Sequence, residues 1–122
     1  MTAKSSARFH GGLRLHRPAE FKLVYQHGRR FNNPYFTAAV YANSLAHPRL
    51  GLSIAARTIG NAVARNRIKR AVRESFRQHQ HSLPALDIVI GARPAARDVA
   101  AHTLVRESLR ELWTRIGVTC AA

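Results

Sequence analysis

The clearest pattern in the chain is the run from Gly60 to Arg77, which divides into two faces when it is read with the 3.6-residue period of an α-helix. One face carries small and apolar side chains: Ala64, Ile68, Ala71, Val72, Ser75 and Phe76. The other face carries positive charge: Lys69, Arg70, Arg73 and Arg77, with Arg65 and Arg67 on its flanks. Asn61 is a favourable N-cap. The run predicts an amphipathic helix that packs on a core and presents a basic face.

Weaker patterns predict the elements on either side of this helix. Between Pro18, a residue common at helix starts, and Gly28, apolar residues recur at helical spacing. From Arg49 to Ala55, apolar and small residues alternate as in a strand with one buried face. In order, we expect a helix at 18–27, strands at 35–42 and 49–55, the basic helix, which ends before Pro84, a strand at 87–92 and a last helix. That helix has Asp98 as a candidate cap and Gly117 as its expected end, and an extra short strand near 29–31 is compatible with the pattern.

The αββαβα order predicts a single α/β domain. A chain of 122 residues suits one modest core, and no repeat or long linker divides it. We expect a two-layer (α+β) sandwich, although helices separated by strands would also fit three layers. The expected divisions are a basic N-terminal arm at 1–12, one folded domain at 13–117 and a C-terminal tail at 118–122.

The charge balance indicates a polyanionic partner. The chain has 20 Lys and Arg residues against 6 Asp and Glu, a net charge of +14, and most of the basic residues are arginines. The planar fork of Arg suits phosphate and stacks on bases. An anionic membrane surface would require bulky apolar anchors opposite the charges, whereas the apolar face of the basic helix is mostly Ala, Val, Ile and Ser. These observations favour nucleic acid, and RNA in particular.

Candidate catalytic residues are few. The carboxylates are Glu20, Glu74, Asp87, Asp98, Glu107 and Glu111. A nuclease that uses two metal ions needs several carboxylates around ions about 3.5–4 Å apart, whereas Glu107 and Glu111 are flanked by arginines and fit surface ion pairs better. His79 and His81 have no cysteine or carboxylate beside them, and no phosphate-binding or dinucleotide motif is present. We therefore expect no catalytic residue and no metal site in this chain.

Cysteine content and hydropathy predict the compartment. Cys120 is the single cysteine, which suits a reducing cytosol. Arginines interrupt every candidate N-terminal signal, and the longest uncharged run, at 31–48, is too polar to cross a bilayer. We expect a soluble cytoplasmic protein.

Aromatic residues gather in the first third of the chain, where Phe21 and Tyr25 lie four residues apart on the first predicted helix. Two interpretations are open. The rings can pack into the sheet as ordinary core, or they can line a groove on which unpaired bases stack, at about 1–3 kcal/mol per base.

The start of the basic helix resembles the signature of a known family. The run Ile59-Gly60-Asn61-Ala62-Val63-Ala64-Arg65-Asn66-Arg67-Ile68-Lys69-Arg70 is similar to that of the bacterial ribonuclease P protein subunit. The resemblance extends from Leu13 to about Ile116 and includes the segments at 21–28, 49–54 and 87–93.

The resemblance implies a ribosomal-protein-like fold with a rare left-handed βαβ crossover. It implies that the partner RNA is the catalyst, using magnesium ions to remove the 5′ leader of precursor tRNA. On this resemblance the residues expected to contact the catalytic RNA are Arg65, Asn66, Arg67, Lys69 and Arg70, and the basic face adds Arg73. The residues expected to line a leader-binding cleft are Phe21, Tyr25 and Arg57. Ala39 stands where some relatives carry a Tyr close to the leader.

The alternative function is a non-enzymatic RNA-binding module, such as a ribosome-associated protein of similar fold. The signature at 65–67, together with Phe21 and Tyr25, favours the ribonuclease P reading, because a generic basic domain would need neither feature.

Overall fold

The computed structural model describes residues 14–15, 17–99 and 103–120. Its helices are α2 (Pro18–His27), α3 (Ala56–Ile59), α4 (Ala62–His79) and α5 (Thr103–Cys120), with 3₁₀ turns η2 (Gln80–Ser82) and η3 (Pro94–Val99). Its strands are β1 (Arg29–Asn32), β2 (Phe36–Ala42), β3 (Arg49–Ser53) and β4 (Leu86–Ala92). Within these ranges, no helix has the length and apolar character needed to cross a membrane.

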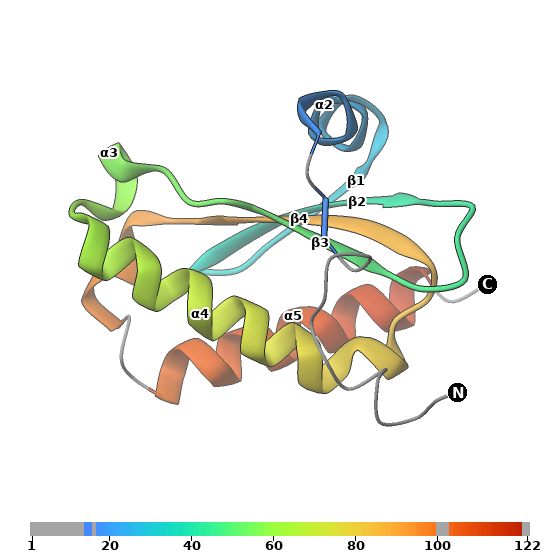
Figure 1. The fold of residues 1–122 in the computed structure, drawn as a ribbon. Helices are drawn as coiled ribbons and strands as arrows, with labels where there is room; N and C mark the ends of the chain where they lie inside the picture. Colours follow the sequence, from blue (N-terminus) through green and yellow to red (C-terminus); the bar gives the residue numbers. More distant parts are fainter. Residues whose placement is uncertain (1–13, 16, 100–102, 121–122) are drawn as a thin grey trace.

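The strands form one mixed sheet in the order β1-β2-β4-β3. β2 pairs antiparallel with β1 and β4, whereas β3 and β4 run parallel. Parallel neighbours require a crossover connection, which α4 supplies. Figure 1 shows β3 in front of β4 with α4 below both, so the path from β3 through α4 to β4 turns with a left hand. About 98% of such crossovers are right-handed, and the rare hand is the one that the family resemblance implies.

The main core lies between one face of the sheet and the helices α4 and α5 (Figure 1). Alternate residues of the central strands point to this face: Phe36, Ala38, Val40, Ile88 and Ile90. The facing helix residues are Ile68, Val72 and Phe76 from α4 and Leu109, Leu112 and Ile116 from α5. Each such side chain contributes about 1.5–3 kcal/mol when it is fully buried. Packing against the sheet, more than local helix propensity, therefore holds both helices in place.

A smaller cluster on the opposite face fixes α2. Leu15, Val24, Ala39 and Val89 are buried there, and Phe21 packs against them. Arg49 ties the helix to the sheet: its Nε and Nη2 atoms each donate to one oxygen of Asp87 at 2.8 Å, and its Nη1 donates to Glu20 of α2 at 3.0 Å. The short α2 thus adds a partial third layer to the two formed by the sheet and the long helices.

Most predicted elements are confirmed, and the extra strand is β1. The prediction that Gly117 ends the last helix is wrong, because α5 continues to Cys120 and residues 118–120, expected in a tail, are helical. A Cβ atom at Gly117 would lie 3.3 Å from the backbone oxygen of Ser82, so this glycine permits close packing between α5 and η2. The expected N-terminal arm at 1–12 and the side chain of Asp98 lie outside what the structure describes.

Candidate nucleic-acid interface

The two faces of α4 separate as the sequence predicts. Asn61 caps the helix, since its Oδ1 atom accepts a hydrogen bond from the backbone nitrogen of Ala64 at 2.9 Å. The buried residues of α4 are Ile68, Val72, Ser75 and Phe76, and Ala64 and Ala71 pack at the edge of the core. The core contact therefore fixes which side of the helix faces outward.

The basic face of α4 presents unused hydrogen-bond donors. Asn66, Arg67 and Arg70 are exposed, whereas Arg65, Lys69 and Arg73 are half-buried. None of these six side chains forms a hydrogen bond or ion pair with another residue in the described part of the chain. The Nε atom of Arg65 is enclosed and has no protein acceptor there. The other donors of these side chains are free to bind an external anion.

Arg73 shows how closely the positive charges are held. Burial lowers the pKa of Arg73, and repulsion from Arg14 lowers it further. An arginine nevertheless remains charged at neutral pH. Two guanidinium groups that repel each other in the free protein gain energy when an anion lies between them, so this corner of the surface favours a negatively charged partner.

Glu74 is the one carboxylate on α4, and it is already paired. Arg77 donates from Nε to Glu74 at 3.2 Å, and Gln78 donates to the other carboxylate oxygen at 3.2 Å. The hydrogen bond from Arg77 lowers the pKa of Glu74 and keeps it ionised at neutral pH. The pair offsets one positive charge near the C-terminal end of α4 and leaves the charges of its first turns uncompensated.

A hollow of about 190 Å³ at the outer edge of β3 connects the two sets of predicted residues. Phe21 of α2 lines one side of it, and Lys69 and Arg73 of α4 line the other, with Leu50 and Leu52 of β3 between them. The structure thus brings a member of the expected leader cleft next to two members of the expected RNA-binding face.

Gly51 of β3 gives the ring of Phe21 room to lie on the sheet. A Cβ atom at Gly51 would lie 2.7 Å from Cζ and 2.9 Å from Cε2 of Phe21. Such distances are shorter than any ordinary carbon contact, so only glycine permits this position of the ring. Phe21 remains half-buried, with part of its surface accessible.

Tyr25 lies one turn further along α2 and is 37% exposed. The guanidinium of Arg30 stacks over its ring at 5.5 Å, and the Nη2 atom of Arg30 donates to the backbone oxygen of Tyr25 at 2.8 Å. The ring is therefore held at the surface by a cation–π contact, and only Val24 of α2 is fully buried. Tyr25 does not line the hollow that Phe21 shares with α4.

Arg57 lies apart from these rings, exposed on α3 beyond the end of β3. Figure 1 shows α2 and α3 over different parts of the sheet. Ser53, Gly91 and Thr37 are in register across β3, β4 and β2, on the face that carries α2. Ser53 and Thr37 are exposed. A strip of sheet with small side chains thus extends toward α3.

Ala39 is buried on this same face, against Val24 and Val89. A base in the strip would therefore meet the surface formed by Thr37 and Gly91 and not the side chain of Ala39. The residue type alone does not reveal this burial.

Sequence reasoning missed Arg14 and Gly51 as parts of this surface. Arg14 pairs with Leu50 through a β-bridge, and no local periodicity of the sequence predicts that contact. Gly51 carried a signal, because an isolated glycine inside a strand often marks a close approach of another group.

Two of the remaining candidates for chemistry, His79 and Glu111, have structural partners. The Nδ1 atom of His79 lies 2.8 Å from the backbone oxygen of Ser75, and Glu111 pairs with Arg115 one turn away at 3.0 Å. In the described ranges, no three His, Cys, Asp or Glu side chains lie close enough together to hold a metal ion. The described ranges therefore offer unused hydrogen-bond donors on α4 and no such metal-binding cluster.

Comparison with known proteins shows the family to which this chain belongs. The model of the Ribonuclease P family matches residues 9–117. The ribonuclease P protein component of Aliivibrio fischeri is 44% identical over 86% of this chain and 89% of its own length. That of Salmonella arizonae is 47% identical over 84% of this chain and 86% of its own length.

Solved structures agree with the sequence relatives. The RNase P protein of Staphylococcus aureus superposes with a TM-score of 0.77 at 36% identity, covering 85% of this chain and 94% of the other. The RNase P protein of Thermotoga maritima superposes with a TM-score of 0.76 at 34% identity, covering 84% of this chain and 96% of the other. The chain therefore belongs to the bacterial ribonuclease P protein family, whose members are subunits of an endoribonuclease.

Proposed function

We propose that this subunit binds the catalytic RNA of ribonuclease P through the basic face of α4 and binds the 5′ leader of precursor tRNA beside α2. In this role it assists the magnesium-dependent removal of the leader, which gives the mature 5′ end of the tRNA. The magnesium ions, held by the RNA, supply the activated water for phosphodiester hydrolysis. The protein contributes binding and orientation.

One observation carries the first half of the proposal: six side chains on the outward face of α4 keep their donors unused by other described residues. They are Arg65, Asn66, Arg67, Lys69, Arg70 and Arg73. Phosphate oxygens are strong acceptors for such groups, and contacts to the backbone position an RNA without reading its sequence. Since α4 is fixed by its core contacts, this face is rigid and suits a folded RNA of defined shape.

The leader assignment is supported by the accessible surface of Phe21 and Tyr25. Both rings stay partly exposed on one side of α2, and both adjoin positive charge, from Arg73 and Arg30 respectively. Aromatic rings beside a basic path are the usual means of holding unpaired bases. Arg57, across the strip of Ser53, Gly91 and Thr37, would contact the leader backbone further along.

A non-enzymatic RNA-binding module is the alternative. It would share the basic face of α4 but would have no reason to distinguish a leader-bearing precursor from mature tRNA. The decisive property is therefore selectivity between these two substrates.

The test uses two sets of variants in the reconstituted holoenzyme. Arg65→Ala plus Arg67→Ala is expected to weaken assembly with the ribonuclease P RNA. Phe21→Ala is expected to weaken binding of leader-bearing precursor by about fivefold or more, which corresponds to the loss of one stacked base, and to leave mature tRNA unchanged. Leu23→Ala, on the exposed side of α2, is the matched control. Equal loss for both tRNAs in the Phe21 variant would refute the leader assignment.

A further inference from the structure

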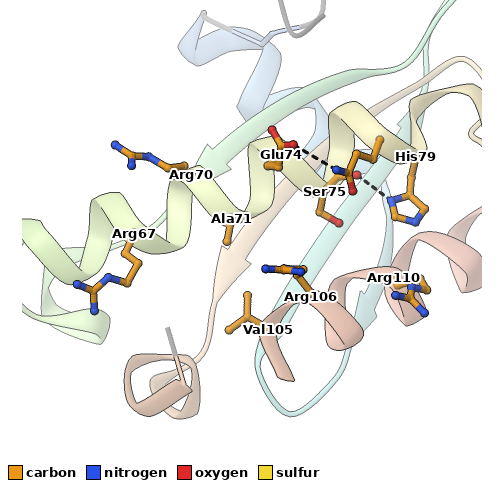
Figure 2. Close-up of a pocket in the computed structure, with 10 residues that line it drawn as sticks. Arg67, Arg70, Ala71, Glu74, Ser75, His79, Val105, Arg106 and Arg110 are labelled. Atoms are coloured by element: carbon orange, nitrogen blue, oxygen red, sulfur yellow. Dashed lines mark hydrogen bonds between the residues drawn. The ribbon is translucent and has the colours of Figure 1, made fainter. Parts of the chain in front are cut away.

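A second basic surface lies beside the first, in a groove of about 440 Å³ between α4 and α5 (Figure 2). Its rim carries Arg67 and Arg70 from α4 and Arg106 and Arg110 from α5. The groove exists because α4 presents small side chains here, including Ala71 and Ser75. Figure 2 shows Arg106 extending from α5 toward Ala71 of α4.

The walls of this α4–α5 groove are rigid. Trp113 of α5 donates from Nε1 to the Oγ of Ser75 at 2.8 Å, and its ring meets Phe76 of α4 edge-on at 5.8 Å. Both aromatic residues are buried. The spacing of the helices is thus set by the core, so the four arginines extend from backbones held at a fixed separation.

The charge in the groove is uncompensated. Within the described residues, none of the four arginines has a hydrogen-bond or ion-pair partner. Glu74 is the one carboxylate that lines the groove, and Arg77 and Gln78 already engage it. Because a rigid, positively charged concave surface concentrates anions, the groove suits an anionic ligand.

The chemistry of the lining favours a phosphate backbone over an acidic protein. The apolar side chains of the lining are those of Ala71 and Val105, and no Phe, Tyr or Trp lines it. Protein interfaces are enriched in such aromatic anchors at their cores, and bases also need rings on which to stack. Binding of a phosphodiester backbone requires only donors, which arginine forks supply.

We propose that the α4–α5 groove binds a second stretch of RNA phosphate backbone, so that the RNA contact continues from the basic face of α4 onto Arg106 and Arg110 of α5. This inference rests on the proposed function, because Arg67 and Arg70 belong to both surfaces. It adds two arginines that lie far along the chain from the α4 signature. It also predicts that their contact is independent of RNA sequence.

The salt dependence of binding to a bacterial ribonuclease P RNA tests the proposal. Each phosphate contact contributes about 0.7–0.9 to the slope of log K against log salt. Arg106→Gln plus Arg110→Gln is therefore expected to reduce the steepness of that slope by about 1.4–1.8. Between 50 and 200 mM salt, the affinity of the double variant would then fall about tenfold less than that of the wild type.

Arg29→Gln plus Arg93→Gln is the matched control. Both residues are exposed and do not line the groove, and the two substitutions remove the same charge as those in the groove. An equal change of slope in both double variants would overturn the proposal. An unchanged slope in the groove variant would also overturn it. If the groove binds polyglutamate in place of RNA, it is assigned to an acidic protein.

Failure of the inference and failure of the proposed function are distinguishable. If the wild type binds the RNA and Arg65→Ala plus Arg67→Ala weakens that binding, an unchanged slope in the groove variant removes the second contact only. If the wild type itself binds the RNA no better than an unrelated RNA of equal length, the proposed function fails and the groove with it.

Discussion

Replacement of Gly51 by alanine is expected to affect the proposed leader-binding surface more than the stability of the fold. The new methyl group would lie 2.7 Å from Cζ of Phe21 and 3.1 Å from Cβ of Leu15. Carbon atoms in favourable contact are about 3.5–4.0 Å apart, so the Phe21 ring must retreat by about 1 Å. The colliding Phe21 atoms are at the free end of a side chain, and Leu15 needs to shift by only a few tenths of an ångström.

The effect on stability is expected to be small because two contributions oppose each other. Full burial of a Phe side chain contributes about 1.5–3 kcal/mol, and the half-buried Phe21 would lose part of this, about 1 kcal/mol. Against that loss, alanine within a strand is favoured over glycine by about 0.5–1 kcal/mol. The free energy of unfolding of Gly51→Ala is therefore expected within about 1 kcal/mol of the wild type.

Binding is expected to change more than stability. Displacement of the ring weakens stacking by about 1 kcal/mol, at the low end of the range for one base, which is about fivefold in affinity for leader-bearing precursor tRNA. Urea unfolding measures the first quantity, and titration of the reconstituted holoenzyme with precursor and mature tRNA measures the second. A loss of more than 3 kcal/mol in stability, or equal weakening for both tRNAs, would refute the reasoning.

Three further predictions concern the N-cap of α4, the ion pairs of Arg49 and the salt dependence of RNA binding. Asn61→Ala removes the hydrogen bond to the backbone nitrogen of Ala64 and is expected to lower the free energy of unfolding by about 1 kcal/mol, whereas Asn61→Asp should retain it; equal loss in both would contradict the capping role. Arg49→Met leaves the buried Asp87 without its cation and is expected to cost about 2–4 kcal/mol by urea unfolding. Arg77→Met breaks the exposed ion pair with Glu74 and should change stability little. A loss of stability equal to that of Arg49→Met would contradict the stabilising role of the Arg49 ion pair. Assembly with the ribonuclease P RNA should show a slope of log K against log salt of about −4 to −5 if six or seven of the basic residues proposed for this RNA on α4 and α5 contact phosphates, and a slope near zero would contradict the phosphate contacts.

The prediction of α4 is confirmed because a helix with one buried face shows a helical period of apolar residues in its sequence. Alternation of small and apolar side chains with charges fixed both the inward residues, such as Ile68 and Phe76, and the outward ones, such as Arg70. The N-cap at Asn61 is likewise a local interaction between residues three positions apart. Local periodicity therefore sufficed for this element.

Non-local contacts were beyond such reasoning. Glycine is common at helix ends, but Gly117 lies inside α5, where it leaves room for the backbone oxygen of Ser82. Ser82 is 35 positions earlier in the chain. The α4–α5 groove likewise depends on how separate elements pack. The sequence also left open whether Phe21 is core or surface, and the structure shows a ring that packs on Gly51 while part of it stays accessible.

The central claim is that this chain assists a catalytic RNA and does not cut by itself. The most direct measurement is precursor tRNA cleavage by a bacterial ribonuclease P RNA at low magnesium, where the RNA alone is weakly active, with and without the protein. We expect the protein to stimulate release of the 5′ leader, the Arg65→Ala plus Arg67→Ala variant to stimulate it less, and the protein without RNA to give no product. Absence of stimulation by the wild type, or cleavage by the protein alone, would contradict the account.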